Sequence, residues 1–535
     1  MLAPFRHETF RLLWLATLIS NLGGLVQSVG AGWMMTTLTD SHSMVALVQA
    51  STTLPIMIFS IAAGALADNF DRRVVMIIAQ SGMAVVSVLL AVLGFMGLLS
   101  PWLLLTFTFL IGAGTALFNP SWQASMGDIV PRDDLPGAVT LNAMGFNMMR
   151  SIGPAVGGLI VALAGAAAAF ALNALTYLPL IAALLRWQPE RVPNRLPRES
   201  FGSAILAGIR YVSLSPNLTT VLFRSFLFGL AAVAVLALLP SVASDYVGGG
   251  ALSYGTLLGS FGVGAIGGAF FNGRIREQFS NELIVRFACV GFALACAGLG
   301  SSRDLVLSHL MLLPAGFCWV LTMSLFNVSI QLSSPRWVVG RALSLYQTAT
   351  FGGMALGSWL WGLGADAAGP GWALTMAAVV LLSCALVGLR LPLPQFEQRD
   401  LGPLNTFNEP VLRLDLTPRS GPIMIMVDYR IDQADIPRFL ALMTDRRRIR
   451  LRDGARQWAL LRDLAEPDLW VESYHVPTWV DYVRHNLRRT KADAENFQQL
   501  RALHRGDDVP FVHRMIERQT VPRDDETPLR GAPDV

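Results

Sequence analysis

Two acidic and two basic side chains interrupt long apolar segments near the start of the chain. Asp68 and Asp71 lie in the stretch GALADNFDRRVVM, residues 64–76, and the pair Arg72 and Arg73 follows them directly. Charged side chains at the end of a membrane-spanning helix are costly and tend to serve function. The stretch is therefore either a functional element or a charged loop that sets the topology of the chain.

A further charge, Arg150, lies inside an apolar segment. It stands near the middle of residues 138–162, one helical turn before the sequence GPAVGG. A cation at that depth costs at least ~2.5–3.5 kcal/mol on insertion scales. Arg150 must therefore face an interior cavity, an anionic substrate or a polar neighbour such as Asn147. Arg224 lies only about two turns into its own segment, so we expect its charged end to extend to the membrane interface.

The composition indicates a membrane body followed by a soluble domain. Hydrophobic residues make up 53% of the chain and charged residues 15%, against roughly 25% charged in soluble domains. Residues 1–399 carry 15 acidic and 20 basic side chains, and residues 400–535 carry 22 and 21. The net charge of +4 is too small to indicate nucleic-acid binding. Four cysteines in apolar stretches lack metal-ligand spacing, so we predict neither a metal site nor a cofactor.

Twelve apolar segments are long enough to span a bilayer, since a span needs about 20 residues. They cover residues 11–36, 43–67, 73–97, 102–124, 138–162, 166–186, 218–241, 253–273, 283–300, 305–330, 342–365 and 371–390. Arginines concentrate in one set of the connecting loops, whereas the opposite set holds Arg303 and little else. The positive-inside rule then places both termini and the central linker in the cytoplasm.

The central linker divides the spans into six and six. It is rich in proline and arginine, and residues 201–211 are predicted to form a short amphipathic helix on the membrane surface. Residues 130–158 also resemble residues 334–358, which indicates a weak internal repeat. Two related halves of six helices are typical of secondary transporters.

These features together resemble the major facilitator superfamily. The residues that match its charged loop motif are Gly64, Leu66, Asp68, Asp71, Arg72 and Arg73. The residues that match the end of its antiporter-type motif are Gly153, Pro154, Gly157 and Gly158. Within the superfamily, FRLLWLATLISNLGGLVQSVGAGWMM and SLYQTATFGGMALGSWLWGLGAD resemble the enterobactin-exporter-like branch, also described as transmembrane secretion effectors.

The resemblance implies roles for particular residues. In the family, the charged motif holds the two halves together on the cytoplasmic side, which would pair Asp68 with the region of Arg341, and Arg72 with Asp128. Spans 1, 4, 7 and 10 line the central cavity in the family, so the candidates there are Asn21, Gln27, Asn119 and Asn327. Arg150 of span 5 and its neighbour Asn147 are added as candidates because of the depth of the Arg150 charge. Alternatively, each of these amide side chains forms a hydrogen bond between two helices. Proton antiport is the family's usual coupling, although the sequence shows no carrier for the proton.

The C-terminal part of the chain has a different pattern. Its predicted order of elements over residues 421–520 is β-α-β-β-α-β, which is ferredoxin-like. It resembles the small α+β domain of cofactor-independent antibiotic-biosynthesis monooxygenases, which usually dimerise. His475 and Tyr474 lie near several tryptophans, so a pocket for an aromatic ligand is conceivable there. A regulatory or dimerising role is favoured over catalysis, because no convergent acid–base set is visible.

The predicted architecture is therefore an all-α integral membrane protein of twelve helices with a ferredoxin-like α+β domain. Its predicted parts are a six-helix bundle (1–186), a linker (187–217), a second bundle (218–391), a second linker (392–420), the small domain (421–520) and a disordered tail (521–535). We expect a non-enzymatic exporter of small amphipathic molecules, siderophore-like or drug-like, in the cytoplasmic membrane. The alternative is a membrane-tethered, monooxygenase-like enzyme acting through residues 421–519.

Overall fold

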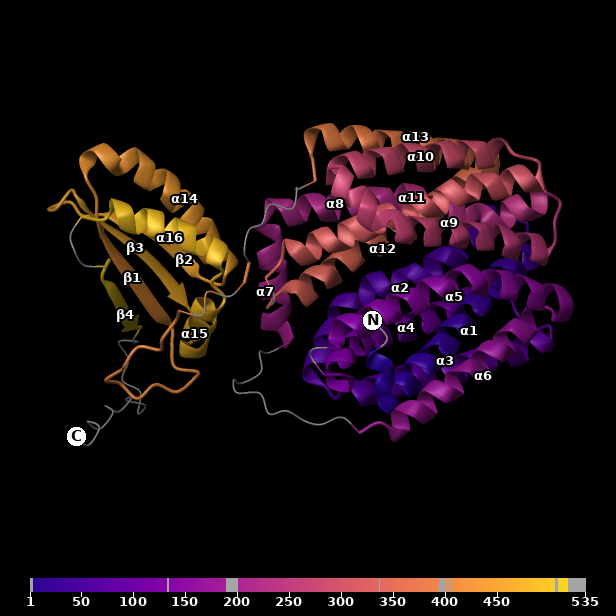
Figure 1. Cartoon of the computed structure of the whole chain (residues 1–535), viewed down its shortest axis with the longest axis horizontal. Helices are drawn as coiled ribbons and strands as arrows, with labels where there is room; N and C mark the ends of the chain where they lie inside the picture. Colours follow the sequence, from indigo (N-terminus) through magenta and orange to yellow (C-terminus); the bar gives the residue numbers. More distant parts are fainter. Residues whose placement is uncertain are drawn as a thin grey trace. The chain divides into compact units, whose positions relative to one another are not determined.

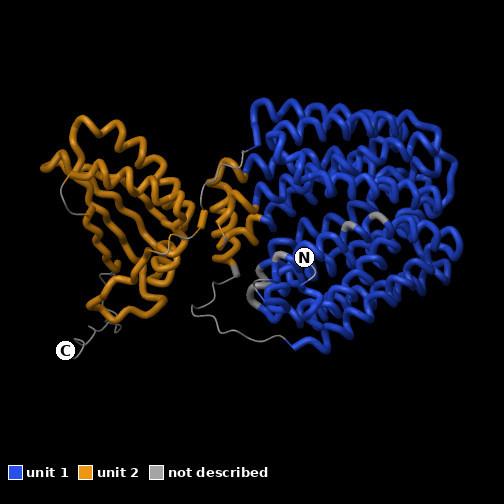
Figure 2. Tube along the Cα trace, in the orientation of Figure 1, with its two compact units in different colours: residues 1–201, 219–330, 343–395 blue, residues 202–218, 331–342, 396–535 orange. Residues whose placement is uncertain are grey.

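The chain folds into two compact units, which Figure 2 colours separately. The computed structural model describes residues 3–131, 134–188, 201–335, 337–393, 401–402, 404, 406–505 and 509–517. The first unit contains residues 1–201, 219–330 and 343–395, and the second contains residues 202–218, 331–342 and 396–535. Residues 189–200 and 394–400 of the predicted linkers, and the predicted disordered tail, lie outside the described residues.

Long helices make up the first unit. Figure 1 labels them in chain order, and their bounds are α1 (Glu8–Leu38), α2 (His42–Asn69), α3 (Arg72–Phe95), α4 (Pro101–Ile129), α5 (Leu135–Ala164), α6 (Ala166–Arg186), α8 (Pro216–Ser241), α9 (Ala251–Gln278), α10 (Asn281–Ser301), α11 (Leu305–Leu332), α12 (Val339–Ala368) and α13 (Pro370–Arg390). Side-chain caps begin several of them. Ser41 accepts a hydrogen bond from the Met44 N–H at the start of α2, and Asp71 accepts one from the Arg73 N–H at the start of α3. Such caps satisfy N–H groups that have no partner inside the helix.

These helices correspond to the twelve predicted segments. Among the described residues, eleven helices are long and apolar enough to cross a membrane. The exception is α12, which has 30 residues but carries several glycines, hydroxyls and an amide. Its Trp361 Nε1 donates to the Leu230 carbonyl of α8 at 2.7 Å, and its Gly353 and Gly357 lie against the α8 backbone. A helix packed this closely against its neighbours needs less apolar surface for lipid.

The second unit contains a four-stranded antiparallel sheet with helices packed on one face. Its elements are α7 (Phe201–Ser213), β1 (Ile423–Arg430), α14 (Ile436–Arg452), β2 (Arg456–Arg462), β3 (Leu469–Val476), α15 (Trp479–Leu487), α16 (Lys491–Leu503) and β4 (Val512–Ile516). The strand order is β2-β3-β1-β4, which is ferredoxin-like as predicted. Alternate residues of β1, such as Ile425 and Tyr429, join a core with Phe439 of α14, Tyr482 of α15 and Leu500 of α16.

Two segments outside the C-terminal stretch belong to this unit. They are residues 202–218, which contain most of α7, and residues 331–342, which connect α11 to α12. The rings of Tyr211 and Trp337 pack edge to face with centroids 5.4 Å apart. The guanidinium of Arg452 lies 5.0 Å from the Tyr211 ring centroid, and that of Arg488 lies 4.0 Å from the Trp337 ring centroid. Cation–π contacts of this kind contribute about 0.5–1 kcal/mol at exposed sites and more when desolvated.

Candidate functional site

A cavity of about 940 Å³ lies within the first unit, between α1–α6 and α8–α13. Of the side chains predicted to face it, Asn21, Gln27, Asn119, Arg150 and Asn327 line it. The remaining candidate is Asn147, whose side chain lies outside what the structure describes. Ligand pockets in proteins usually measure about 300–1,000 Å³, so the cavity has room for an organic molecule of drug size or somewhat larger.

Arg150 of α5 is the only formally charged side chain among the described residues that line the cavity. Its guanidinium carbon lies 5.9 Å from the ring centroids of both Phe261 in α9 and Trp319 in α11. Aromatic faces attract cations, but they leave the five N–H donors of an arginine available. No carboxylate in the described part of the chain lies within ion-pair distance of Arg150. The residue therefore presents an uncompensated positive charge to the cavity.

Gln27 also takes part in a buried hydrogen-bond network that sequence analysis did not predict. Its side-chain carbonyl accepts from the Asn173 amide of α6 and, at 3.1 Å, from the Ser87 hydroxyl of α3. Asn173 Nδ2 also lies 3.1 Å from the Tyr177 hydroxyl oxygen. The network ties α1, α3 and α6 together. The main role of Gln27 is therefore to hold neighbouring helices together. Its position on the cavity wall is secondary.

The glycine-rich motif of α5 forms close helix crossings. Gly153 lies against the Leu25 side chain of α1, and a Cβ on Gly157 would stand 3.0 Å from the Val26 Cα. A Cβ on Gly158 would stand 2.7 Å from the Gly255 Cα of α9. Pro154 lies within the same helix and lines the cavity. The motif thus lets α5 approach a helix of its own half and a helix of the other half.

Polar contacts join the two halves at both ends of α2. At its start, Asp366 of α12 accepts hydrogen bonds from the Ser41 hydroxyl at 3.1 Å and from the Ser43 N–H at 3.2 Å. Near its other end, the Ser60 hydroxyl lies 2.8 Å from the Thr348 hydroxyl of α12. These contacts are few and neutral or singly charged, so either set can open at a modest cost in free energy.

The charged loop places its arginines against neighbouring helices. Arg72 Nη1 donates to Asp128 Oδ2 of α4 at 2.8 Å and to the Ala124 carbonyl at 3.0 Å. Arg73 donates to the carbonyls of Leu184 and Leu185, at the end of α6. The loop therefore ties α3 to α4 and α6 within the first half.

The two residues of the predicted contact across the halves are described less completely. Asp68 lies in α2, but its side chain is outside what the structure describes. Arg341 belongs to the second unit, where its side chain lies against Gly208 of α7. Gly64, the first residue of the motif, faces Ser344 of α12, because a Cβ there would stand 3.0 Å from the Ser344 hydroxyl oxygen. The pairing of Asp68 with the Arg341 region stays a prediction.

The partner of Arg224 was not predicted. Its side chain is 3% exposed and forms an ion pair with Glu282 at the start of α10. The position of its charged end at the membrane interface stays a prediction. Glu282 also accepts from Arg286 Nε at 2.7 Å and from the Leu393 N–H at 2.9 Å. The acid lies at the first turn of α10, where sequence analysis did not search for a partner.

Residues 1–521 match the family of transmembrane secretion effectors. The chain belongs to this family of the major facilitator superfamily. The match extends through the sheet of the second unit, so that part is included in the family pattern. Curated relatives include the enterobactin exporters EntS of Shigella flexneri and of Escherichia coli O1:K1. Each is 28% identical over 403 residues, which cover 72% of this chain and 93% of the relative.

Solved structures share the fold of the helical unit. A bacterial homologue of the human lysosomal transporter Spinster, in an inward-facing and occupied conformation, has a TM-score of 0.58 at 14% identity, over 72% of this chain and 97% of its own. A POT family transporter in complex with 5-aminolevulinic acid has a TM-score of 0.59 at 11% identity, over 72% and 96%. These structures show the fold of the helical unit, and the family match makes the chain a multi-pass membrane transporter of the major facilitator type.

Proposed function

We propose that this transporter exports small amphipathic anions across the cytoplasmic membrane by alternating access, with protons moving inward in exchange. The observation that carries the proposal is the cavity between the two halves. It combines aromatic and aliphatic walls with amides and one uncompensated cation, Arg150. An apolar pocket with a few placed polar groups suits an amphipathic ligand, and the positive charge favours an anion.

The relatives support the direction and the class of substrate. They are named as exporters of enterobactin, and this chain covers nearly their whole length. A siderophore-like or drug-like molecule is the corresponding cargo for this chain. Orientation follows from the arginines, which place both termini and the sheet domain in the cytoplasm by the positive-inside rule.

The charged loop is proposed to act as a gate. In this scheme Asp68 closes the cytoplasmic side by meeting the N-terminal end of α12, where a carboxylate is favoured by the helix dipole. The Arg72–Asp128 ion pair holds the loop against α4. The contacts of Ser41 and Ser43 with Asp366 close the opposite side. Alternating access then consists of making one set of contacts while the other opens.

Efflux from whole cells tests the proposal. Cells without their own efflux pumps would be loaded with catecholate siderophores, dyes or macrolides, and retention would be measured with and without this chain. We expect export of one compound class, lost in Asp68→Asn at equal membrane abundance, because the gate lacks its charge. Normal export by Asp68→Asn would contradict the gate.

Proton coupling needs a separate measurement. Inverted membrane vesicles that contain the chain should accumulate the exported compound when their interior is acidified, and a protonophore should abolish this. Accumulation that ignores the proton gradient would contradict proton antiport. Absence of transport for every compound, with the protein present in the membrane, would direct attention to the enzymatic alternative in residues 421–519.

A further inference from the structure

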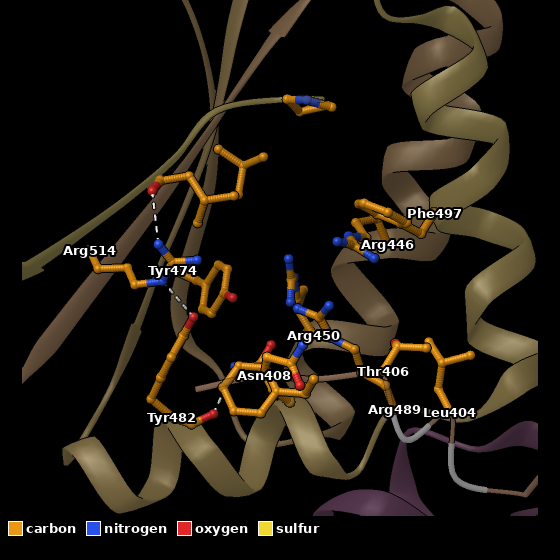
Figure 3. Close-up of a pocket in the computed structure, with 15 residues that line it drawn as sticks. Leu404, Thr406, Asn408, Arg446, Arg450, Tyr474, Tyr482, Arg489, Phe497 and Arg514 are labelled. Carbon is orange, nitrogen blue, oxygen red and sulfur yellow. Dashed lines mark hydrogen bonds between the residues drawn. The ribbon is translucent and has the colours of Figure 1, made fainter. Parts of the chain in front are cut away.

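The second unit contains a cavity of its own. It measures about 340 Å³ and lies between the sheet and the helices α14–α16. Figure 3 shows arginines and aromatic rings around it. The described residues that line it are Leu404, Thr406, Phe407, Asn408, Val427, Arg446, Arg450, Tyr474, Tyr482, Asn486, Arg489, Phe497, Pro510, Val512 and Arg514. The set contains four arginines and no acidic side chain.

Glu472 of β3 lies beneath this cavity and compensates part of the charge. Its Oε1 accepts from Arg450 Nε at 3.0 Å, and its Oε2 lies 3.6 Å from Arg446 Nε. Burial opposes the charge of Glu472, but Arg450 and Arg446 outweigh burial and lower its pKa to about 2. One ionised carboxylate thus faces two buried arginines. Arg446 is 4% exposed, and its Nε has no hydrogen-bond partner in the described structure.

Arg489 has no such compensation. No carboxylate of the described residues lies within ion-pair distance of its guanidinium. Burial, and after it the positive charge of Arg450, lower its pKa to about 10. His485 does not compensate the charge of Arg489 either. It is a neutral imidazole that accepts a hydrogen bond from Arg450 Nη1 at 3.0 Å. Arginine stays charged in proteins, and even a half-buried cation such as Arg489 costs free energy when it has no partner. An anion in the cavity would remove that cost.

Aromatic rings define the shape of the remaining space. The Arg450 guanidinium lies 4.4 Å from the Tyr474 ring centroid. Arg514 Nε donates to the Tyr482 hydroxyl at 2.7 Å, and Phe407 packs edge to face on Tyr482. Phe497 forms a further wall, 5.5 Å from the Arg446 guanidinium. A planar molecule fits between rings better than a branched one, since rings gain energy from stacked or edge contacts.

We propose that this cavity is a binding site for a small aromatic carboxylate, with Arg489 and Arg446 as the groups that bind its negative charge. Guanidinium groups bind carboxylates through two parallel N–H···O hydrogen bonds. Tyr474 and Phe497 lie against the ring of the ligand. The site is separate from the transport cavity, and its existence does not depend on the cargo of the transporter.

Calorimetric titration of the full chain in detergent with salicylate tests the proposal. Salicylamide, which has nearly the same shape without the charge, serves as the matched ligand. We expect saturable binding of one salicylate per chain and at least tenfold weaker binding of salicylamide. Phthalate and phenyl phosphate extend the set of probes. If none of the anions binds, or if salicylamide binds as tightly as salicylate, the proposal is overturned.

Variants locate the bound probe. Arg489→Met should weaken salicylate binding at least tenfold, whereas Arg448→Met should leave it unchanged. Arg448 lies on α14, is about half exposed and pairs with Asp445, so it is a matched control. If the signal disappears in Arg150→Met and persists in Arg489→Met, salicylate occupies the central cavity and the proposal is overturned.

Thermal unfolding separates ligand binding from a structural role. Without ligand, Arg489→Met should unfold at the same temperature as the unmodified chain or higher, because it removes an uncompensated, half-buried charge. Salicylate should then raise the unfolding temperature of the unmodified chain but not that of the variant. A variant that unfolds earlier and still binds salicylate would show that Arg489 is structural, which overturns its assigned role.

Discussion

Arg150 lies within a membrane-spanning helix and near two aromatic rings. It has no acidic partner among the described residues. Replacing it by methionine should reduce export of an anionic cargo at least tenfold, because the cavity loses the one formal charge among the described residues that line it. Membrane abundance should stay equal or rise, since a cation at that depth costs at least ~2.5–3.5 kcal/mol. Export assays with an anionic compound and a neutral analogue of similar size measure this. Equal losses for both compounds would indicate that Arg150 shapes the cavity instead of selecting charge.

Sequence alone predicted the depth of polar residues better than their partners. Asn21 and Asn119 were assigned to the cavity because spans 1 and 4 face it in the family, and Arg150 because a cation at its depth is costly in lipid. All three line the cavity. The partner of Arg224 was missed because Glu282 is 58 residues away and lies at a helix start. Asn173 was missed for a similar reason. Hydropathy indicates that a residue is in the membrane, but not the face of the helix on which it lies.

At the scale of elements, the crossing of α5 and α9 depends on two facing glycines. Gly158→Ala adds a methyl group 2.7 Å from the Gly255 Cα and 2.9 Å from the Ala251 carbonyl oxygen. Backbone atoms cannot rotate away, so this arrangement should be destabilised by about 1–3 kcal/mol, as for other overpacked sites. Transport should slow several-fold, measured as initial efflux rate.

Gly82→Ala is the control for this substitution. Gly82 lies in α3, and a Cβ there meets nothing within 4 Å. Its variant should transport at the normal rate or be slightly more stable, because alanine favours a helix. Equal slowing in both variants would indicate that the effect comes from helix propensity and not from the crossing.

The elements of the sheet domain were largely predictable, whereas its pocket was not. Alternation in residues 421–431 predicted the first strand, and the pattern of residues 435–451 predicted the helix after it; the structure places them at Ile423–Arg430 and Ile436–Arg452. His475 and Tyr474 were proposed to share a pocket, but only Tyr474 lines the cavity. Adjacent residues of a strand point to opposite faces. The arginines of the pocket come from α14, the end of α15 and β4, and no local pattern indicates that they converge.

At the scale of the whole molecule, acid should loosen the sheet domain through His485. Burial and then Arg450 lower its pKa well below 6.5. The unfolded chain therefore binds a proton below about pH 6.5 that the folded chain does not. The free energy of unfolding should fall by up to about 1.4 kcal/mol per pH unit below that value. The pKa of Asp453 shifts in the opposite direction, because burial raises it to about 6.

A variant isolates the contribution of His485. The difference in opening free energy between the unmodified chain and His485→Asn should change with pH below about 6.5, since Asp453 and the other groups are common to both. Hydrogen exchange of the β3 amides in the full chain measures this difference. A difference that does not change from pH 7 to pH 5 would contradict a neutral, buried His485.

The linear division into bundles and linkers does not describe the second unit. Amphipathic residues 201–211 were predicted to lie on the membrane surface, and the helix exists as α7. The structure groups it with residues 331–342 and the sheet domain. An amphipathic pattern shows that one face of a helix is apolar, but it does not specify whether lipid or protein covers that face.

The aromatic pair Tyr211 and Trp337 has a consequence for how a shortened chain behaves. Both rings are covered by arginines that arrive more than a hundred residues later, Arg452 and Arg488. A protein cut after residue 393 would retain the two rings and lose both cations. Poor expression or aggregation of this shortened protein would then be explained by the exposure of the two aromatic rings. Single substitutions in the full chain are therefore a better test than truncation of what residues 394–535 contribute.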